Sequence, residues 1–530
     1  MISAQAAAAS GARTGQAGAF GGFRTRWALL LSAAGGLATF AASPPLGVWP
    51  LAFLGPGVLV VALTGRRLRS SFGCGLVFGL ALFVPLLSWL INVAWYAWAA
   101  LAGAEALIFA LVCVGQRLLL ELPFWPALVA AWWVAAEALR DRWPFAFPWG
   151  RLAMSQSVAP DVRWVAVGGA PLLSFLVALT SAMAARWVLG MLAAGSFSWS
   201  WRRALPAAVT AGLVLAGGLL PVDPVGGAPV ATVAAIQGNV PRARNLPQLL
   251  NDSEVTQNHV AATDKLAALV KSGRLPAPDV VIWPENATSL DPREYPPLSA
   301  ELARAAATAG KPILIGEVLD NPRRNVGQLW VPGTGPTTIY VKRRLVPFGE
   351  YIPFRGVISS FSSLPALQPI DFTAGRDPVV FHVGKIRLGD VICYEVAFDD
   401  LVRSEVNAGA NLIALQSNDA DFELDGQLGE TEQQTAMARI RAIESDRAVV
   451  YASTTGESTI IAPSGAIIEQ SQVWRQAILD ARVPLVSYRT LADRIGAWPE
   501  YVLILVTVLA LGFAVVTVRR RRNQRDVSGV

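Results

Sequence analysis

The feature that most constrains the fold of this 530-residue chain is a series of long apolar windows. They cover residues 27–42, 49–63, 72–95, 98–114, 124–139, 164–187, 204–220 and 501–518. These windows are long enough, or nearly so, to cross a bilayer as helices. The chain is also 53% hydrophobic and only 15% charged, unlike an ordinary soluble enzyme. We therefore expect a membrane protein with a soluble part, with about seven spans before that part and one after it.

Basic residues test this count independently, because cytoplasmic loops of membrane proteins are enriched in Lys and Arg. Arginines beside the windows lie at positions 24, 26, 66, 67, 69, 117, 186, 202–203 and 519–522. An even number of spans places all of them on one side, which we assign to the cytoplasm. The net charge of +6 therefore reflects topology and predicts no nucleic-acid partner, because the basic clusters lie beside apolar runs rather than along one face.

This topology divides the chain into five segments. They are a disordered cytoplasmic N-terminus (1–23), a membrane domain (24–221), an exported catalytic domain (222–497), a final transmembrane helix (498–518) and a basic cytoplasmic tail (519–530). No cleavage-like site follows a compatible apolar region near the start, so we expect the first span to be an uncleaved anchor.

The exported segment alternates short β-like runs with Ala-rich helical stretches. The runs cover residues 231–237, 279–283, 312–317, 337–341, 386–393, 411–416, 448–453 and 458–462. The helical stretches cover residues 260–271, 298–309, 396–408 and 431–446. An apparent hairpin at 332–335 argues against a purely parallel sheet. We therefore predict a polytopic α-helical membrane domain plus an α/β domain in which two mixed sheets lie between helix layers.

Cys393 is the candidate nucleophile, because Cys74 and Cys113 both fall in apolar windows. The three cysteines and two histidines of the chain provide no disulfide framework or zinc-ligand spacing, and they disfavour a His-based triad. A reactive thiolate needs a proton acceptor and a cation. Glu285 and Lys342 supply both from the ends of two predicted strands.

These three residues can meet, because strand ends in α/β folds converge on a common rim. Glu285 would exchange protons with the thiol, the leaving oxygen and the attacking amine, while Lys342 and the backbone N–H after Cys393 would stabilise an oxyanion. Taken singly, such a Cys is more often a small core residue, and such a Glu or Lys is usually a solvated charge. Together they suggest acyl transfer, although composition and spacing reveal no substrate.

Several motifs resemble those of the carbon–nitrogen hydrolase (nitrilase) superfamily. They are Trp283-Pro284-Glu285, the segment 342–353, Cys393-Tyr394-Glu395 and Ser417-Asn418-Asp419-Ala420. Within that superfamily, residues 345–351 and the flanking spans are similar to the apolipoprotein N-acyltransferase family. The likeness also includes the loop at 147–149 and the pair at 155–156, so it covers nearly the whole chain.

The resemblance implies a nitrilase-like αββα sandwich on the periplasmic or extracytoplasmic side of a bacterial cell (inner) membrane. It assigns catalysis to Glu285, Lys342 and Cys393. The implied reaction is ping-pong, and it is the last step of lipoprotein maturation. Cys393 takes an acyl chain from a glycerophospholipid as a thioester, and the α-amino group of a diacylglyceryl apolipoprotein accepts it. No metal or organic cofactor is implied, and we expect a monomer.

Glu350, Tyr394 and Glu395 match positions that support the site in this family. The two carboxylates have an alternative role as structural acids that pair with the basic side chains at 342–344. The helix predicted at 431–447 is expected to pack, with its arginines at 439, 441 and 447 solvated or ion-paired.

The chain departs from the family pattern at three places. A Trp that is often found after the first strand is missing from residues 242–250, Asp421 replaces a common Trp, and Gln434 replaces a common His. We expect these positions to lie around the acyl and headgroup region rather than among the three reacting groups. Two other classes stay open, namely a membrane-anchored amidase that uses water as acceptor and a non-catalytic membrane scaffold.

Overall fold

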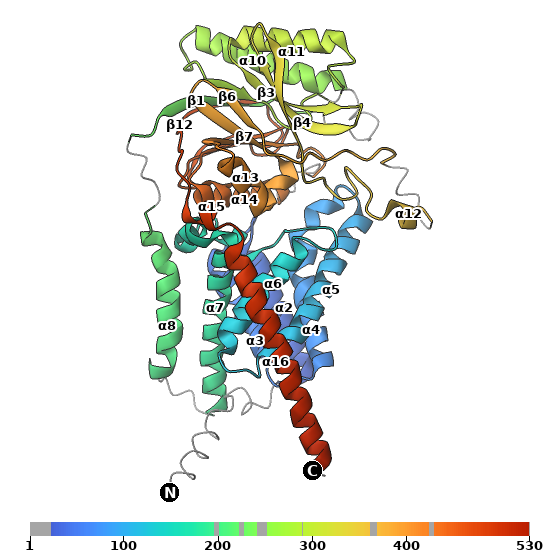
Figure 1. Cartoon of the computed structure of the whole chain (residues 1–530), viewed down its shortest axis with the longest axis vertical. Coiled ribbons are helices and arrows are strands. Elements are labelled where there is room, and N and C mark those ends of the chain that lie inside the picture. Colours follow the sequence, from blue (N-terminus) through green and yellow to red (C-terminus); the bar gives the residue numbers. More distant parts are fainter. Residues whose placement is uncertain are drawn as a thin grey trace.

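The computed structural model describes residues 23–194, 201–221, 227–240, 252–288, 290–360, 368–422 and 429–528. A bundle of helices forms one end of the molecule, and two stacked β-sheets form the other (Figure 1). Apart from Phe23, the predicted N-terminal segment 1–23 lies outside the described residues, as do the positions of the missing Trp at 242–250.

Each predicted apolar window consists mainly of helical residues, in one helix or in two consecutive helices. The bundle consists of α2 (Thr25–Ala42), α3 (Gly55–Leu63), α4 (Leu68–Leu86), α5 (Trp95–Leu119), α6 (Trp125–Arg140), α7 (Val165–Ala193), α8 (Trp201–Leu215) and α16 (Trp498–Ser528). Short 3₁₀ helices join them: η2 (Trp49–Phe53), η3 (Ser88–Ile91), η4 (Leu152–Gln156), η5 (Pro160–Trp164) and η6 (Ala216–Leu219).

Two boundaries differ from the prediction. The window at 72–95 is not one helix, because α4 ends at Leu86, one residue after Pro85, and the chain continues into η3. At the other end of the chain, α16 continues through Ser528, beyond the predicted end at 518. By length and composition, four described segments are able to cross a membrane: Leu68–Leu86, Trp95–Leu119, Pro160–Ala193 and Trp498–Thr517.

Small residues let the helices of the bundle pack closely. A Cβ at Gly75 of α4 would lie 2.6 Å from the carbonyl oxygen of Phe109, and a Cβ at Gly79 would lie 2.6 Å from the Cα of Ala106. Both neighbours belong to α5, so glycine at these two positions allows the backbones of α4 and α5 to touch.

The segment between the bundle helices α8 and α16 forms two six-stranded sheets within the described residues. The first sheet has the order β12 (Ala477–Pro484), β1 (Val230–Gln237), β2 (Val280–Ile282), β3 (Ile313–Leu319), β4 (Arg324–Val331), β5 (Gly335–Val341). The second has the order β11 (Ile467–Gln470), β10 (Thr459–Ile461), β9 (Val449–Ser453), β8 (Leu412–Ser417), β7 (Ile386–Ile392), β6 (Val380–Val383). Both sheets are mixed, and β4 and β5 form the predicted hairpin.

Helices cover both outer faces, which confirms the predicted αββα sandwich. The helices α10 (Asp252–Lys271) and α11 (Pro296–Ala309) pack on the first sheet, and α13 (Asp399–Asn407) and α14 (Glu430–Ser445) pack on the second. An apolar layer that includes Val233, Ile282, Leu388 and Ala414 fills the space between the sheets. The remaining short helices are α12 (Arg355–Ile358), η8 (Cys393–Ala397) and α15 (Leu491–Ile495).

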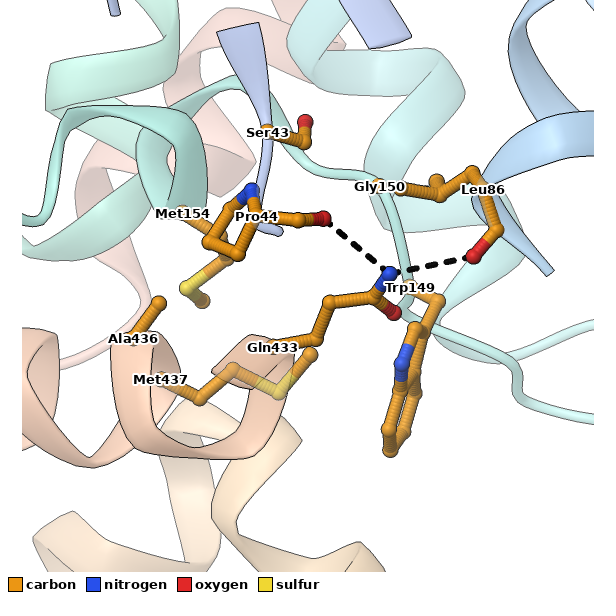
Figure 2. Close-up of a pocket in the computed structure, with 9 residues that line it drawn as sticks. All are labelled: Ser43, Pro44, Leu86, Trp149, Gly150, Met154, Gln433, Ala436 and Met437. Carbon is orange, nitrogen blue, oxygen red and sulfur yellow. Dashed lines mark hydrogen bonds between the residues drawn. The ribbon is translucent and has the colours of Figure 1, made fainter. Parts of the chain in front are cut away.

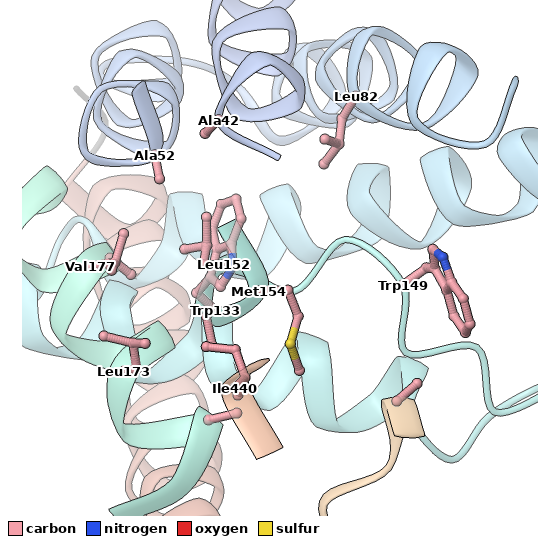
Figure 3. Close-up of a cluster of buried hydrophobic side chains, with 14 of the residues drawn as sticks. Ala42, Ala52, Leu82, Trp133, Trp149, Leu152, Met154, Leu173, Val177 and Ile440 are labelled. Carbon is pink, nitrogen blue, oxygen red and sulfur yellow. The ribbon is translucent and has the colours of Figure 1, made fainter. Parts of the chain in front are cut away.

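The outer helix α14 also belongs to the core of the bundle. Ile440 of α14 lies in one buried apolar cluster with Leu152, Met154 and Leu173, which come from η4 and α7 (Figure 3). The helix layer on the second sheet and the bundle therefore share one continuous core, so the two parts are packed together rather than joined only by linkers.

Buried charges fix the same contact. Arg151, in the loop after α6, lies 2.9 Å from Asp399 of α13, and Arg441 of α14 lies 2.5 Å from the same carboxylate. The prediction that Arg441 is ion-paired is therefore correct. Arg447 was expected to be solvated or ion-paired, but it is buried and donates to backbone carbonyls such as that of Ala410 at 2.9 Å.

Candidate active site

The three sequence-predicted reactive residues all follow strands. Glu285 lies three residues after β2, and Lys342 directly follows β5. Cys393 directly follows β7, but it does not close that strand as predicted, because it is the first residue of η8 and has a φ of 51°. A positive φ is uncommon for a residue with a Cβ, so the turn holds Cys393 in a strained conformation.

Lys342 is buried between two carboxylates. Its Nζ lies 2.9 Å from Oε1 of Glu285 and 3.1 Å from Oε1 of Glu350. Burial alone lowers the pKa of Lys342, but the two carboxylates outweigh burial and raise that pKa well above its ordinary value. The ammonium group therefore stays charged at neutral pH.

Asn325 of β4 completes this arrangement, and the sequence analysis missed it. Its Nδ2 donates to Oε1 of Glu285 at 2.6 Å and to Oε1 of Glu350 at 2.8 Å. The second oxygen of Glu285 accepts a hydrogen bond from the backbone N–H of Asn418 at 3.0 Å. Three hydrogen-bonding groups thus orient the Glu285 carboxylate, namely the Lys342 ammonium, the Asn325 amide and the backbone N–H of Asn418, and of these only Asn325 lay outside the recognised motifs.

The Cys393 thiol lies in the electrostatic field of this group. Burial raises the pKa of Cys393 well above its ordinary value, the Glu285 charge raises it further, and the Lys342 charge opposes both. The resting residue is therefore a thiol rather than a standing thiolate.

Glu395 is a buried carboxylate that joins two loops of the site. It accepts hydrogen bonds from the backbone N–H groups of Ile392 at 2.8 Å, Arg343 at 2.6 Å and Arg344 at 2.9 Å, and from the Tyr340 hydroxyl at 2.7 Å. The structural alternative had Glu395 pair with a basic side chain at 342–344, whereas its hydrogen bonds at 343 and 344 are to the backbone. It connects the loop after Lys342 to the turn at the cysteine.

Glu350 does pair with Lys342, as the structural alternative predicted. Its second oxygen accepts a hydrogen bond from the backbone N–H of Val346 at 2.7 Å. Glu350 therefore holds the loop at 346–350 against the ammonium group.

Tyr394 points away from this cluster, toward the helix bundle. Its hydroxyl donates to the carbonyl oxygen of Ala146 at 2.5 Å, and its ring stacks on Trp149 with 5.6 Å between ring centroids. Burial raises the pKa of the Tyr394 phenol well above its ordinary value. The residue next to the cysteine therefore contacts the loop that follows α6.

Among the described residues, no group of three or more His, Cys, Asp or Glu side chains is placed to hold a metal ion.

Comparison with known proteins assigns the family. The model of the apolipoprotein N-acyltransferase N-terminal domain matches residues 34–183, and the carbon–nitrogen hydrolase model matches residues 232–493. An apolipoprotein N-acyltransferase of Mycolicibacterium smegmatis is 37% identical over 92% of this chain and 85% of its own length. The chain belongs to the apolipoprotein N-acyltransferase family.

Other relatives of this family align over almost their entire length. The apolipoprotein N-acyltransferase of Pseudomonas syringae pv. tomato is 30% identical, with 93% of this chain and 97% of that protein covered. Among solved structures, an amidase from Nesterenkonia sp. AN1 of the nitrilase superfamily covers 50% of this chain and 93% of its own, at 16% identity and a TM-score of 0.35.

Membership of the apolipoprotein N-acyltransferase family confirms the predicted resemblance, the fold class and the acyltransferase class. It also favours acyl transfer over the membrane-anchored amidase. Together with the apolar helices, it identifies the chain as a membrane enzyme.

One expectation about the departures from the family pattern is wrong. Gln434 does not lie outside the reacting groups, because its Nε2 lies 3.5 Å from Sγ of Cys393. Asp421 is exposed, and the next residue, Phe422, contacts the bundle through Trp89 and through Asn92, whose Nδ2 lies 2.6 Å from the Phe422 carbonyl oxygen.

A narrow pocket lies where α14 meets the bundle, beside Trp149 (Figure 2). Across it, Nε2 of Gln433 donates to the carbonyl oxygens of Pro44 at 3.2 Å and Leu86 at 3.0 Å. Gln433 therefore holds the ends of α2 and α4, while the next residue of α14 contacts the cysteine.

Proposed function

We propose that this enzyme N-acylates the N-terminal S-diacylglyceryl-cysteine of apolipoproteins, with a glycerophospholipid as acyl donor. The observation that carries the proposal is the buried contact of Lys342 with Glu285 beside the only cysteine outside the bundle, Cys393. Substrates that reside in a lipid bilayer give a physical reason for packing this domain on apolar helices.

In the first half-reaction, Glu285 takes the proton of the Cys393 thiol. The sulfur then bonds to the acyl carbon of the phospholipid ester, the ester C–O bond breaks, and Glu285 returns the proton to the leaving oxygen. The products are a lysophospholipid and a thioester on Cys393.

In the second half-reaction, the α-amino group of the lipoprotein attacks the thioester. The new N–C bond forms an amide, the C–S bond breaks, and a proton passes from the amine through Glu285 to the departing sulfur. A thioester suits this step because it is activated toward amines and persists where water is scarce.

The hydrogen bonds of Glu285 support its role as base. Oε1 accepts from both Lys342 and Asn325, whereas Oε2 accepts only from the backbone N–H of Asn418 among the described residues. A carboxylate has about four acceptor positions. One position on Oε2 is therefore left to take the proton of Cys393.

Lys342 is proposed to stabilise the oxyanion of both tetrahedral intermediates. Its charge is held by Glu285 and Glu350 before the substrate arrives, so little reorganisation accompanies the reaction. The backbone N–H that follows Cys393 is the proposed second donor.

We also propose a multi-pass topology with both termini in the cytoplasm and the sheets on the periplasmic or extracytoplasmic side. Contacts at the far end of the bundle support it. Arg117 donates to the carbonyl oxygen of Arg66 at 2.8 Å, and Arg66 lies 3.4 Å from the Thr25 hydroxyl. Three of the basic regions predicted to be cytoplasmic therefore meet at one place, whereas the opposite ends of α2 and α4 contact α14.

The test is the intact mass of the purified enzyme after incubation with a phospholipid of known acyl chains. We expect a mass increase equal to one acyl chain, lost when a diacylated lipopeptide is added, with the chain recovered as an amide. Cys393→Ala should abolish the increase, while Cys74→Ala and Cys113→Ala should keep it. Release of the acyl chain as a free acid, with none on the lipopeptide, would indicate the amidase-like alternative instead.

A further inference from the structure

Gln434 of α14 places a side-chain amide against the reacting sulfur. Its Nε2 lies 3.5 Å from Sγ of Cys393, and the side chain is 1% exposed. No step proposed above uses this contact.

The other partners of Gln434 determine which end of the amide faces the sulfur. Nε2 also contacts the carboxylate of Glu430, and Oε1 lies 3.2 Å from the hydroxyls of both Ser417 and Tyr451. An ionised carboxylate only accepts hydrogen bonds, so the NH₂ group faces Glu430, and its second hydrogen is directed at Cys393.

A buried carboxylate holds the hydroxyl groups in place. Asp419 accepts hydrogen bonds from Ser417 at 2.5 Å, Tyr451 at 2.8 Å and Ser453 at 2.6 Å. Each hydroxyl gives its one hydrogen to Asp419, so the Glu430 carboxylate decides which end of the Gln434 amide faces the sulfur, and the fixed hydroxyl groups hold the side chain in position.

We propose that Gln434 is a further catalytic residue, a neutral hydrogen-bond donor that stabilises the thiolate of Cys393. This proposal rests on the acyl-transfer function proposed above. An amide has no basic site at neutral pH, so Gln434 cannot take the thiol proton, and Glu285 keeps that role.

The donor acts in both half-reactions. The sulfur carries negative charge after it has lost its proton and before it bonds to the acyl carbon, and again when the C–S bond breaks. Between these moments the sulfur is a neutral thioester and a poorer acceptor. Loss of the N–H group should therefore slow formation and breakdown of the thioester together.

The test is the pH dependence of alkylation of Cys393 by iodoacetamide, in which an S–C bond forms and iodide leaves. The full chain carrying Cys74→Ala and Cys113→Ala would be used, so that a single thiol reacts. In Gln434→Met the midpoint of the profile should rise by about one pH unit, and acyl loading at neutral pH should fall about tenfold.

Thr435→Val is the matched control. Thr435 is the next residue of α14, is buried, and has a hydroxyl with no hydrogen-bond partner among the described residues. This variant should leave the alkylation profile unchanged. Gln434→Glu is a second variant of nearly the same shape, for use if Gln434→Met does not fold, and it should raise the midpoint as well.

An unchanged midpoint in a folded Gln434 variant would overturn the proposal. Failure of the proposed function is distinguishable, because an enzyme that never loads with phospholipid would still give an alkylation profile. A raised midpoint in that enzyme would support the thiolate contact while rejecting the acyl donor.

Discussion

The side-chain amide of Asn325 donates to the Glu285 carboxylate, with 2.6 Å between Nδ2 and Oε1. The same amide also donates to Glu350. Asn325 and Lys342 therefore both bridge the two carboxylates, Asn325 with a neutral amide and Lys342 with a charged ammonium group. The two carboxylates are thereby held at fixed positions although their charges repel. We infer that Asn325 positions the base and that its loss moves Glu285 without removing any reacting group.

Replacement of Asn325 tests this inference. Asn325→Leu should slow loading of the enzyme by about tenfold or more, because a hydrogen bond to a charged group is lost from a buried site. Arg324→Gln is the control, because the preceding residue of β4 points to the opposite face of the sheet. A wild-type loading rate in Asn325→Leu would show that the bond has no positioning role.

Glu285 and Lys342 should be separable by the step that each variant blocks. Glu285→Gln keeps the shape of the side chain but cannot take the thiol proton, so the acyl-enzyme should not accumulate even with abundant phospholipid. Lys342→Met should slow formation and breakdown of the thioester alike, by roughly a hundredfold or more. Labelled phospholipid retained on the protein, followed by its loss on addition of lipopeptide, measures both. Loading of Glu285→Gln at the normal rate would assign the base to another group.

Glu317 should give the α/β domain a measurable pH dependence of stability. It lies fully buried on β3, and burial raises its pKa from 4.5 to about 8. Between these values the folded protein holds a proton that the unfolded chain has released. The stability contribution is therefore complete below the unfolded pKa and is lost as the pH rises through the folded pKa.

Glu317→Gln removes this titration and keeps an acceptor for the indole N–H of Trp330. Thermal unfolding measured from about pH 5 to about pH 8.5 should show a smaller loss of stability in the variant than in the parent protein. Curves that stay parallel over this range would mean that Glu317 titrates normally.

Reporter fusions test the proposed topology. Fusions after Gly65, Arg203 and Arg522 should report the cytoplasm, and fusions near Arg151 and Gly335 should report the opposite side. The last site lies in the hairpin between β4 and β5. A cytoplasmic signal there would separate the domain from its proposed substrates.

Much of the fold was predictable because its signals are local. Every apolar window coincides with helix, and all eight predicted β-like runs coincide with strands of the two sheets. Four strands were missed, namely β4, β6, β11 and β12. The strand β4 begins with Arg324 and contains Gly327 and Gln328, so it lacks an apolar pattern of its own and is buried through its pairing with β3 and β5.

The position of Asn325 in the site follows from the missed strand pairing. Asn325 lies on β4, and the register that pairs Val326 with Val341 places it next to Lys342. Gln434 was visible as a departure from the family pattern, but its contact with Cys393 depends on how α14 packs on the second sheet.

The sequence by itself predicted the apolar helices, the alternation of strands and helices and the candidate set of Glu285, Lys342 and Cys393, because hydropathy, periodicity and motifs are properties of neighbouring residues. The tertiary structure alone decided which groups touch them. The hydrogen bond of Asn325 to Glu285 joins residues 40 positions apart in the chain, and that of Gln434 to Cys393 joins residues 41 positions apart. Their formation depends on strand register and helix packing, which no local pattern encodes.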